Sequence, residues 1–294
     1  MRRDQPPTYI DNLLIELERI EEDFVTLLEA STIRYVNPNR PGGGIVFIAA
    51  ADWGWGPSDA GQNASRMELL KRIRDWQPRF DLLFPHPTPE IAKRHGQAFK
   101  LFDRWLVRSR DDYSIPADVP AAIQKLRDAC GSLRDARDLV PADSFAQRLV
   151  VDTNALLDQH DLSSYVPRLG PRYMVHVLPV VLREIDELKR AGRIETVRDA
   201  AKGADRRLKS LRDNGDVLTG ARVSGDVWAI FEHIEPKSDR LPSWLDLTVP
   251  DDRFLASTLL LQSAHPGSAL SVATSDLNLQ TKLAAIGIPF VEPD

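Results

Sequence analysis

From residue 148 onward the chain alternates short apolar segments with amphipathic ones, and this alternation limits its fold more than any other feature. Strands are expected at residues 149–151, 173–178, 227–231, 269–274 and 289–291. The helices expected between them cover residues 179–190, 195–212, 251–263 and 276–286. Such alternation produces a central parallel sheet with helices on both faces. The second half is therefore predicted to be a three-layer α/β/α domain.

The first half shows a different periodicity, with apolar residues at helical spacing over residues 9–30, 64–76, 88–109 and 117–137. A chain of 294 residues is longer than most single domains. We expect a mainly α-helical domain over residues 1–145 and the α/β domain over 146–294. Three glycines at 42–44 precede a predicted strand at 45–48. Because the motifs GK[ST] and GxGxxG are missing, they indicate a turn and not a phosphate-binding loop.

Composition limits the possible partners and surroundings. A formal net charge of -5 argues against a protein that coats nucleic acid through overall positive charge. Cys130 is the only cysteine, which excludes an intrachain disulfide and favours a small buried side chain. The first residues lack the apolar segment of a signal peptide, and no apolar run reaches membrane-spanning length. We expect a cytoplasmic protein without a membrane partner.

Four acidic residues follow or flank the predicted strands of the second half. Asp152 and Asp276 come at the ends of two strands, where open α/β sheets bind their ligands. Glu184 lies one turn into a helix, and Asp252 lies in the first turn of another. Taken singly, each has a structural explanation, as a helix N-cap or as a charge that matches the helix dipole. Four acids at one edge of the sheet favour a functional site instead.

Crowded carboxylates are commonly stabilised by a hard divalent cation, and Mg²⁺ and Mn²⁺ prefer oxygen ligands. Such an ion activates water and stabilises charge on a phosphodiester. The six histidines show neither HxxxH nor HExxH spacing, so a zinc hydrolase is not expected. A phosphatase of the haloacid-dehalogenase type would need a second acid two residues after Asp152, where Asn154 stands.

Four segments in this order resemble the successive motifs of the PIN-domain nuclease family. They are residues 151–154, 182–189, 251–256 and 274–279, and residues 287–290 are similar to the last strand of the family. The resemblance covers about residues 148–292 and implies a Mg²⁺- or Mn²⁺-dependent ribonuclease that leaves a 3′-hydroxyl and a 5′-phosphate. The helix-rich first half shows no resemblance that we recognise to a known family.

By position, the resemblance assigns metal binding and catalysis to Asp152, Glu184, Asp252 and Asp276. Asp251 is the alternative to Asp252, which aligns better because Phe254 and Leu255 then fall on the buried face. The residues expected to orient the carboxylates or a phosphate are Thr153, Asn154 and Ser275. Ser275 departs from the commoner Asn or Arg, which leaves its contact open.

Two sets of residues are candidates for contact with nucleic acid. The first is a row of cations on one face of the helix at 195–212, namely Arg198, Lys202, Arg206 and Lys209. Such a row neutralises phosphates, and it equally suits an ordinary solvated helix face. The second is Trp76 and Trp105 in a basic stretch, where a place in the core is favoured over stacking on bases.

The leading functional hypothesis is a ribonuclease, either endo- or exonucleolytic, that acts on single-stranded RNA. One alternative is a structure-specific DNA nuclease, since the same metal chemistry serves both polymers. Another is a catalytically silent PIN-like module that binds RNA or serves as a scaffold. The N-terminal domain has the possible roles of selecting substrate, recruiting a regulatory partner, forming a homo-oligomer or restraining the nuclease.

Overall fold

The computed structural model describes residues 6–36, 52–108, 112, 114–233, 235–237, 241 and 244–293. The glycine turn and the strand expected at 42–48 lie outside these residues. The chain divides into two compact units, one of residues 11–140 and one of residues 1–10 with 141–294. In the part of the chain that the structure describes, no helix combines the length and hydropathy needed to cross a membrane.

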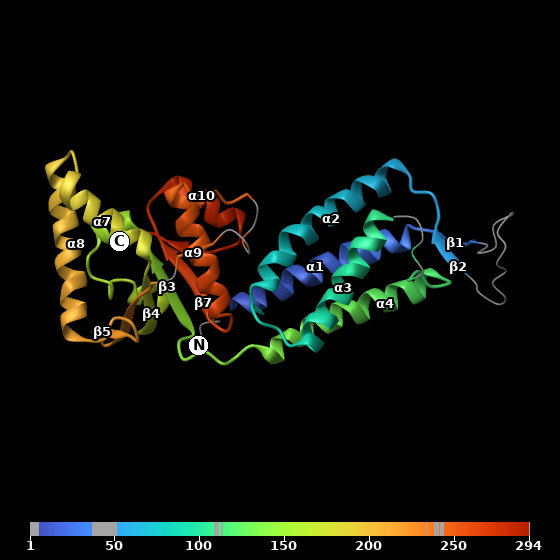
Figure 1. The fold of residues 1–294 in the computed structure, drawn as a ribbon, viewed down its shortest axis with the longest axis horizontal. Helices are drawn as coiled ribbons and strands as arrows, with labels where there is room; N and C mark the ends of the chain where they lie inside the picture. Colours follow the sequence, from blue (N-terminus) through green and yellow to red (C-terminus); the bar gives the residue numbers. More distant parts are fainter. Residues whose placement is uncertain are drawn as a thin grey trace. The chain divides into compact units, whose positions relative to one another are not determined.

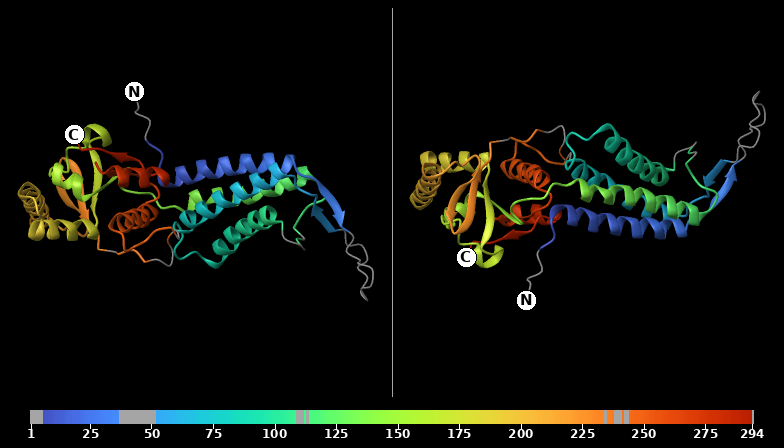
Figure 2. Two further views of the ribbon diagram at one scale, coloured as in Figure 1. Left: turned by 90° about the horizontal axis from the view of Figure 1, so that it is seen from above. Right: turned by 90° about the horizontal axis from the view of Figure 1, so that it is seen from below.

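As far as the structure describes it, the first unit is built from four long helices that run alongside one another (Figure 2). They are α1 (Tyr9–Glu29), α2 (Ala60–Asp81), α3 (Pro89–Val107) and α4 (Val119–Arg134), followed by the 3₁₀ helix η1 (Asp135–Leu139). An antiparallel hairpin of β1 (Ile33–Val36) and β2 (Asp52–Trp55) joins α1 to α2. The prediction of a mainly helical first half is confirmed, whereas the hairpin was not predicted.

Aromatic side chains form the core of this helical unit. Trp76 is fully buried, stacks on Phe80 at 4.9 Å between ring centroids and donates its indole N–H to the Leu13 carbonyl at 3.0 Å. Trp105 is buried as well, and its indole N–H reaches Ser114 Oγ at 2.9 Å. Both tryptophans therefore belong to the core, as expected, and neither is available to stack on bases. Cys130 is also buried.

Truncating the stacked tryptophan is expected to destabilise the helical unit strongly. Trp76→Ala removes a buried indole together with its hydrogen bond to the Leu13 carbonyl, at a cost of about 3–5 kcal/mol. Chemical denaturation of the full chain measures this cost. The matched control is Met67→Ala in the same helix, where the side chain is exposed and little change is expected. Equal stability of the two variants would contradict the assignment of Trp76 to the core.

The second unit contains the predicted sheet, a six-stranded one among the described residues, with the order β5-β6-β4-β3-β7-β8. The strands are β3 (Gln147–Val151), β4 (Arg172–Val177), β5 (Ala221–Ser224), β6 (Asp226–Phe231), β7 (Ala269–Ala273) and β8 (Phe290–Val291). All neighbours pair in parallel except β5 with β6. The predicted parallel sheet is therefore confirmed, with an added antiparallel edge strand.

Helices cover both faces of this sheet, with α7 (Pro179–Ala191) and α8 (Glu195–Asn214) on one side and α9 (Pro250–Ala264) and α10 (Leu277–Ala285) on the other (Figure 1). Two short helices, α5 (Thr153–Asp158) and α6 (Val166–Leu169), lie between β3 and β4 in the chain. The interior is apolar, with Leu149, Val175 and Val272 fully buried. The expected three-layer architecture is confirmed.

Candidate active site

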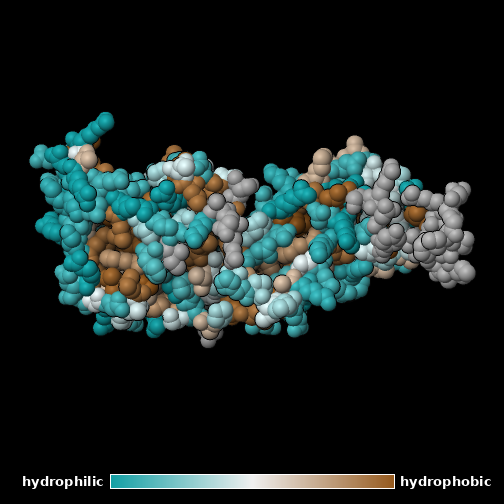
Figure 3. Space-filling view, in the orientation of Figure 1, coloured by the Kyte–Doolittle hydropathy of each residue, from teal (hydrophilic) through white to brown (hydrophobic). Residues whose placement is uncertain are grey.

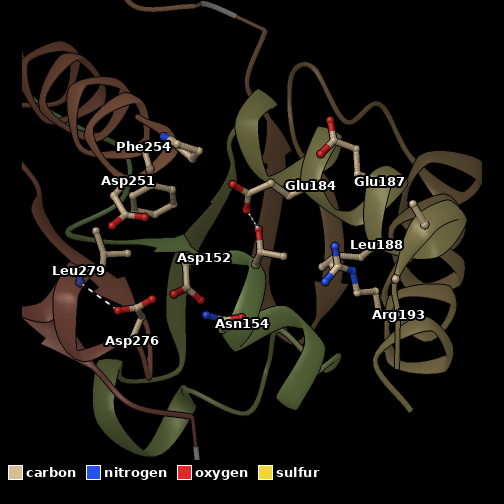
Figure 4. Close-up of a pocket in the computed structure, with 14 residues that line it drawn as sticks. Asp152, Asn154, Glu184, Glu187, Leu188, Arg193, Asp251, Phe254, Asp276 and Leu279 are labelled. Atoms are coloured by element: carbon tan, nitrogen blue, oxygen red, sulfur yellow. Dashed lines mark hydrogen bonds between the residues drawn. The ribbon is translucent and has the colours of Figure 1, made fainter. Parts of the chain in front are cut away.

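The carboxyl ends of the central strands meet at one edge of the sheet. β3 lies between β4 and β7, and Val151 at its end pairs with Val177 on one side and Ala273 on the other. A pocket of about 510 Å³ opens here (Figure 4). Its polar lining consists of Asp152, Thr153, Asn154, Glu184, Glu187, Arg193, Asp251 and Asp276. Most of the predicted acids therefore converge on one cavity.

Asp152 and Asp276 each combine two roles. Asp152 follows β3 and caps α5, because its Oδ1 accepts the Ala155 N–H at 2.6 Å. Asp276 caps α10 by accepting the N–H groups of Asn278 at 2.7 Å and Leu279 at 3.2 Å. Both carboxylates also line the pocket. Capping fixes each side chain at the edge of the sheet, so the structural and the functional interpretations are compatible.

Glu184 projects from α7 toward the same cavity, where the Thr153 hydroxyl donates a hydrogen bond to its Oε2 (Figure 4). Thr153 lies at the start of α5, next to Asp152, and thus holds Glu184 close to the end of β3. Asn154 lines the pocket beside it. Ser275 does not line the pocket, and its hydroxyl donates to Asp158 at 3.4 Å.

The two neighbouring acids at the start of α9 have different surroundings. Asp251 lines the pocket and accepts the Asn278 amide at 2.6 Å. Asp252 does not line it: its carboxylate accepts from the Lys282 ammonium at 2.7 Å and from the Asp246 N–H at 3.0 Å. Burial would raise the pKa of Asp252, but these hydrogen bonds and the charge of Lys282 lower it. Lys282 is therefore shared between the two acids, since its ammonium also lies 3.4 Å from the Asp251 carboxylate.

The electrostatics of the pocket centre on Asp152, which is only 5% exposed. Burial raises the pKa of Asp152 to about 6, and the negative charges of Asp276 and Glu184 act in the same direction. Hydrogen bonds from Thr274 and from the Ala155 N–H oppose this rise without cancelling it. The folded protein therefore holds a carboxylate where its charge is disfavoured, which a bound cation would reverse.

The donors in this pocket suit a hard divalent cation, since carboxylate oxygens are the ligands that Mg²⁺ and Mn²⁺ prefer. Within the described ranges, no three side chains of His, Cys, Asp or Glu lie close enough together to hold an ion as they stand. The residues that fit this role are Asp152, Glu184, Asp251 and Asp276.

The cationic row on α8 is largely engaged within the protein, although the outer face of the helix is hydrophilic (Figure 3). Lys202 pairs with Asp199 at 2.9 Å, and Lys209 pairs with Asp205 at 2.8 Å. Arg198 donates to the Gly192 carbonyl, and Arg206 donates to the Lys202 carbonyl. None of these four residues lines the pocket.

Two polar residues that line the pocket were not identified from the sequence, namely Glu187 and Arg193. Glu187 lies three residues after Glu184 on α7, so helical spacing places the two side chains next to each other and could have predicted its position. Arg193 lies in the short turn between α7 and α8. Its position depends on the path of that turn, for which the sequence contains no pattern.

Comparison with known families identifies the class of this unit. Residues 149–293 match the family model described as PIN domain, which spans the sheet and the whole pocket. No curated protein matches the chain. The C-terminal half therefore belongs to the PIN-domain family, as the sequence motifs predicted. PIN domains are generally metal-dependent nucleases, which is consistent with a pocket lined by acids.

Proposed function

We propose that the pocket is the active site of a Mg²⁺- or Mn²⁺-dependent ribonuclease that hydrolyses phosphodiester bonds of single-stranded RNA. The observation that carries this proposal is the convergence of Asp152, Glu184, Asp251 and Asp276 on one cavity at the edge of the sheet. When bound, the ion would activate water and stabilise charge on the phosphodiester. The domain that holds this site is proposed to begin near residue 146, after a helix-rich domain over 1–145, in a cytoplasmic protein.

In this proposal some residues bind the metal ion and others hold these ligands in place. Asp152, fixed as an N-cap, is the central ligand, and Thr153 orients Glu184 beside it. Asn278 orients Asp251 through its amide. We take Asp251 as the third acid in preference to Asp252, because only Asp251 lines the pocket and Lys282 lies closer to Asp252, at 2.7 Å, than to Asp251, at 3.4 Å. Hydrogen bonds that hold carboxylates in place commonly support metal ligands in this way.

Paired variants distinguish the two neighbouring acids. Asp251→Asn is expected to lower the cleavage rate by more than about 100-fold, and Asp252→Asn by about tenfold or less, since Asp252 would act only by holding Lys282 near Asp251. Initial rates on labelled single-stranded RNA with Mn²⁺ provide the comparison. The reverse order of effects would assign the ligand to Asp252.

The substrate is tested with labelled single-stranded RNA, single-stranded DNA, duplexes and branched DNA, each with Mg²⁺, Mn²⁺ or a chelator. Cleavage of single-stranded RNA that requires the metal is the expected result. Cleavage of branched DNA alone would favour a structure-specific DNA nuclease. Metal-independent binding without cleavage of any substrate would favour a silent module that binds RNA or serves as a scaffold.

A further inference from the structure

The turn between α7 and α8 brings one positively charged side chain, that of Arg193, into the acidic pocket. Arg193 is exposed, lines the cavity and extends toward Asn154 and Leu188 (Figure 4). It lies across the pocket from Asp251 and Asp276 (Figure 4). The described residues provide no hydrogen bond or ion pair to its guanidinium. Arg193 thus presents unused donors in the same pocket as the carboxylates proposed to hold the metal.

The turn that carries Arg193 has a fixed conformation. The Gly192 N–H donates to the Leu188 carbonyl at 3.0 Å, and the Arg198 guanidinium donates to the Gly192 carbonyl at 3.1 Å. A Cβ atom at Gly192 would lie 2.5 Å from the Leu188 carbonyl oxygen and 2.9 Å from Arg198 Cγ. Only glycine therefore fits this position without a shift. Arg198, one of the cations predicted to contact nucleic acid, also stabilises the turn that positions Arg193.

Several other basic residues of these two helices are paired with acids. Lys189 bridges Asp186 at 2.8 Å and Asp205 at 3.1 Å. Arg183 pairs with Glu235, and Arg207 approaches Asp161 at 3.6 Å. These pairs neutralise the helix surface locally. Arg193 differs because it faces the pocket with its charge uncompensated by any described ion pair.

We infer that Arg193 binds a backbone phosphate of the nucleic-acid strand in the pocket, on the side away from Asp251 and Asp276. This inference rests on the proposed function. It supplies a direct hydrogen-bond donor to the phosphate, which ionised carboxylates cannot provide. A guanidinium presents a planar fork of donors that matches two phosphate oxygens. A strand with one phosphate at the metal would thus be held at a second phosphate by Arg193. Arg193 acts as a positioning residue, so its effect falls on binding.

Binding of a short fluorescein-labelled single-stranded RNA, followed by anisotropy in the non-cleaving Asp152→Asn background, tests this contact. Arg193→Ala is expected to weaken binding about tenfold, the loss of one charged hydrogen-bonding group. It should also reduce the slope of log K against log salt by about 0.7, the value for one phosphate of a single strand. Arg193→Lys should recover part of the affinity. The matched control is Arg190→Ala, an exposed arginine at the end of α7 that does not line the pocket.

The position of the contact is tested with RNAs that each carry one neutral methylphosphonate linkage. With Arg193 present, neutralising one linkage is expected to weaken binding about tenfold, and in Arg193→Ala the same linkage should no longer matter. In the cleavage assay, Arg193→Ala should raise KM with kcat nearly unchanged. Equal affinities of Arg193→Ala and Arg190→Ala, or a methylphosphonate pattern unaffected by Arg193, would overturn the inference while leaving the nuclease proposal intact. Absence of any RNA binding would overturn both.

Discussion

Replacing Asp152 by asparagine is expected to lower the rate of RNA cleavage by more than about 100-fold, which exceeds the effect of residues that only orient a metal ligand. Asp152 is the buried acid at the centre of the pocket, with Asp276 and Glu184 as charged neighbours. A neutral amide at this position attracts a divalent cation far less than a carboxylate does. Initial rates of wild type and Asp152→Asn with saturating Mn²⁺ give the comparison.

The same substitution should leave the fold intact. Asparagine is as good an N-cap as aspartate, so the Ala155 N–H keeps an acceptor and α5 keeps its start. The change also removes a buried negative charge that its neighbours oppose. The free energy of unfolding in the presence of a chelator is therefore expected to equal or exceed that of wild type.

A second N-cap provides the matched control for this prediction. Asp118 caps α4 through the Ala121 N–H at 2.8 Å and lies in the helical unit. Asp118→Asn should leave both cleavage and stability close to wild type. If Asp152→Asn instead lost stability and kept its cleavage rate, Asp152 would be a cap and nothing more.

The second large effect is expected at a buried charge network around Arg148. This residue lies near the amino end of β3, whereas the pocket lies at the carboxyl end of the strand. This side chain is 5% exposed and donates to Asp143 at 2.6 Å, to Ser268 at 3.1 Å and to His176 Nε2 at 2.8 Å. Because a guanidinium only donates, His176 Nε2 must accept. The ring proton therefore lies on Nδ1, which donates to Glu232 at 2.8 Å.

Removing the arginine should break this network. Arg148→Met leaves Asp143 buried without its cation and His176 Nε2 without a donor, at a cost of about 3–5 kcal/mol. Denaturant unfolding at neutral pH measures the loss, with Arg190→Met as the control for a methionine in place of an exposed arginine. A loss below about 1 kcal/mol, the range of exposed ion pairs, would show that the network contributes little.

The network also predicts how stability depends on pH. Burial lowers the pKa of His176 to about 4, and the positive charge of Arg148 acts in the same direction, against the hydrogen bond to Glu232. The other titratable groups around His176 are His265, whose ring centroid lies 5.7 Å away, and Asp143, which is paired with Arg148. Since the unfolded chain binds a proton near pH 6.5 and the folded chain near pH 4, stability is retained above pH 6.5 and lost as the pH falls toward 4. The expected loss is about 3 kcal/mol, and it should shrink in His176→Gln.

The sequence predicts the α/β architecture well because the pattern and the packing agree. Strands such as β3 and β7 are buried on both faces, and continuous apolar runs are typical of such strands. Asp152 could be placed because it directly follows β3, and Asp276 because it comes three residues after the end of β7. The short strand β5 was missed, since four residues at an antiparallel edge leave almost no pattern.

The choice between Asp251 and Asp252 shows where sequence reasoning ends. It relied on Phe254 and Leu255 to define the buried face of α9, and both are indeed buried. However, α9 is buried on almost every side, including Ala256, Ser257 and Thr258. A helix without an exposed stripe has no periodicity from which the direction of its first acids follows.

The predicted helix boundaries differ from the observed ones for local reasons. The predicted second helix ends at Trp76, yet α2 continues to Asp81 with Pro78 inside it. Its start at Ala60 depends on a capping box between Asp59 and Gln62, which periodicity does not reveal. Similarly, helical spacing places the cations of α8 on one face but does not show their pairing with Asp199 and Asp205.

Direct binding of Mn²⁺, followed by the loss of the free-ion signal in electron paramagnetic resonance, tests whether the pocket acids hold a metal. We expect wild type to bind the ion, Asp152→Asn and Asp251→Asn to weaken binding by at least tenfold, and Asp118→Asn to bind like wild type. Binding that is equal in all four proteins, or absent from wild type, would contradict a metal site at this pocket.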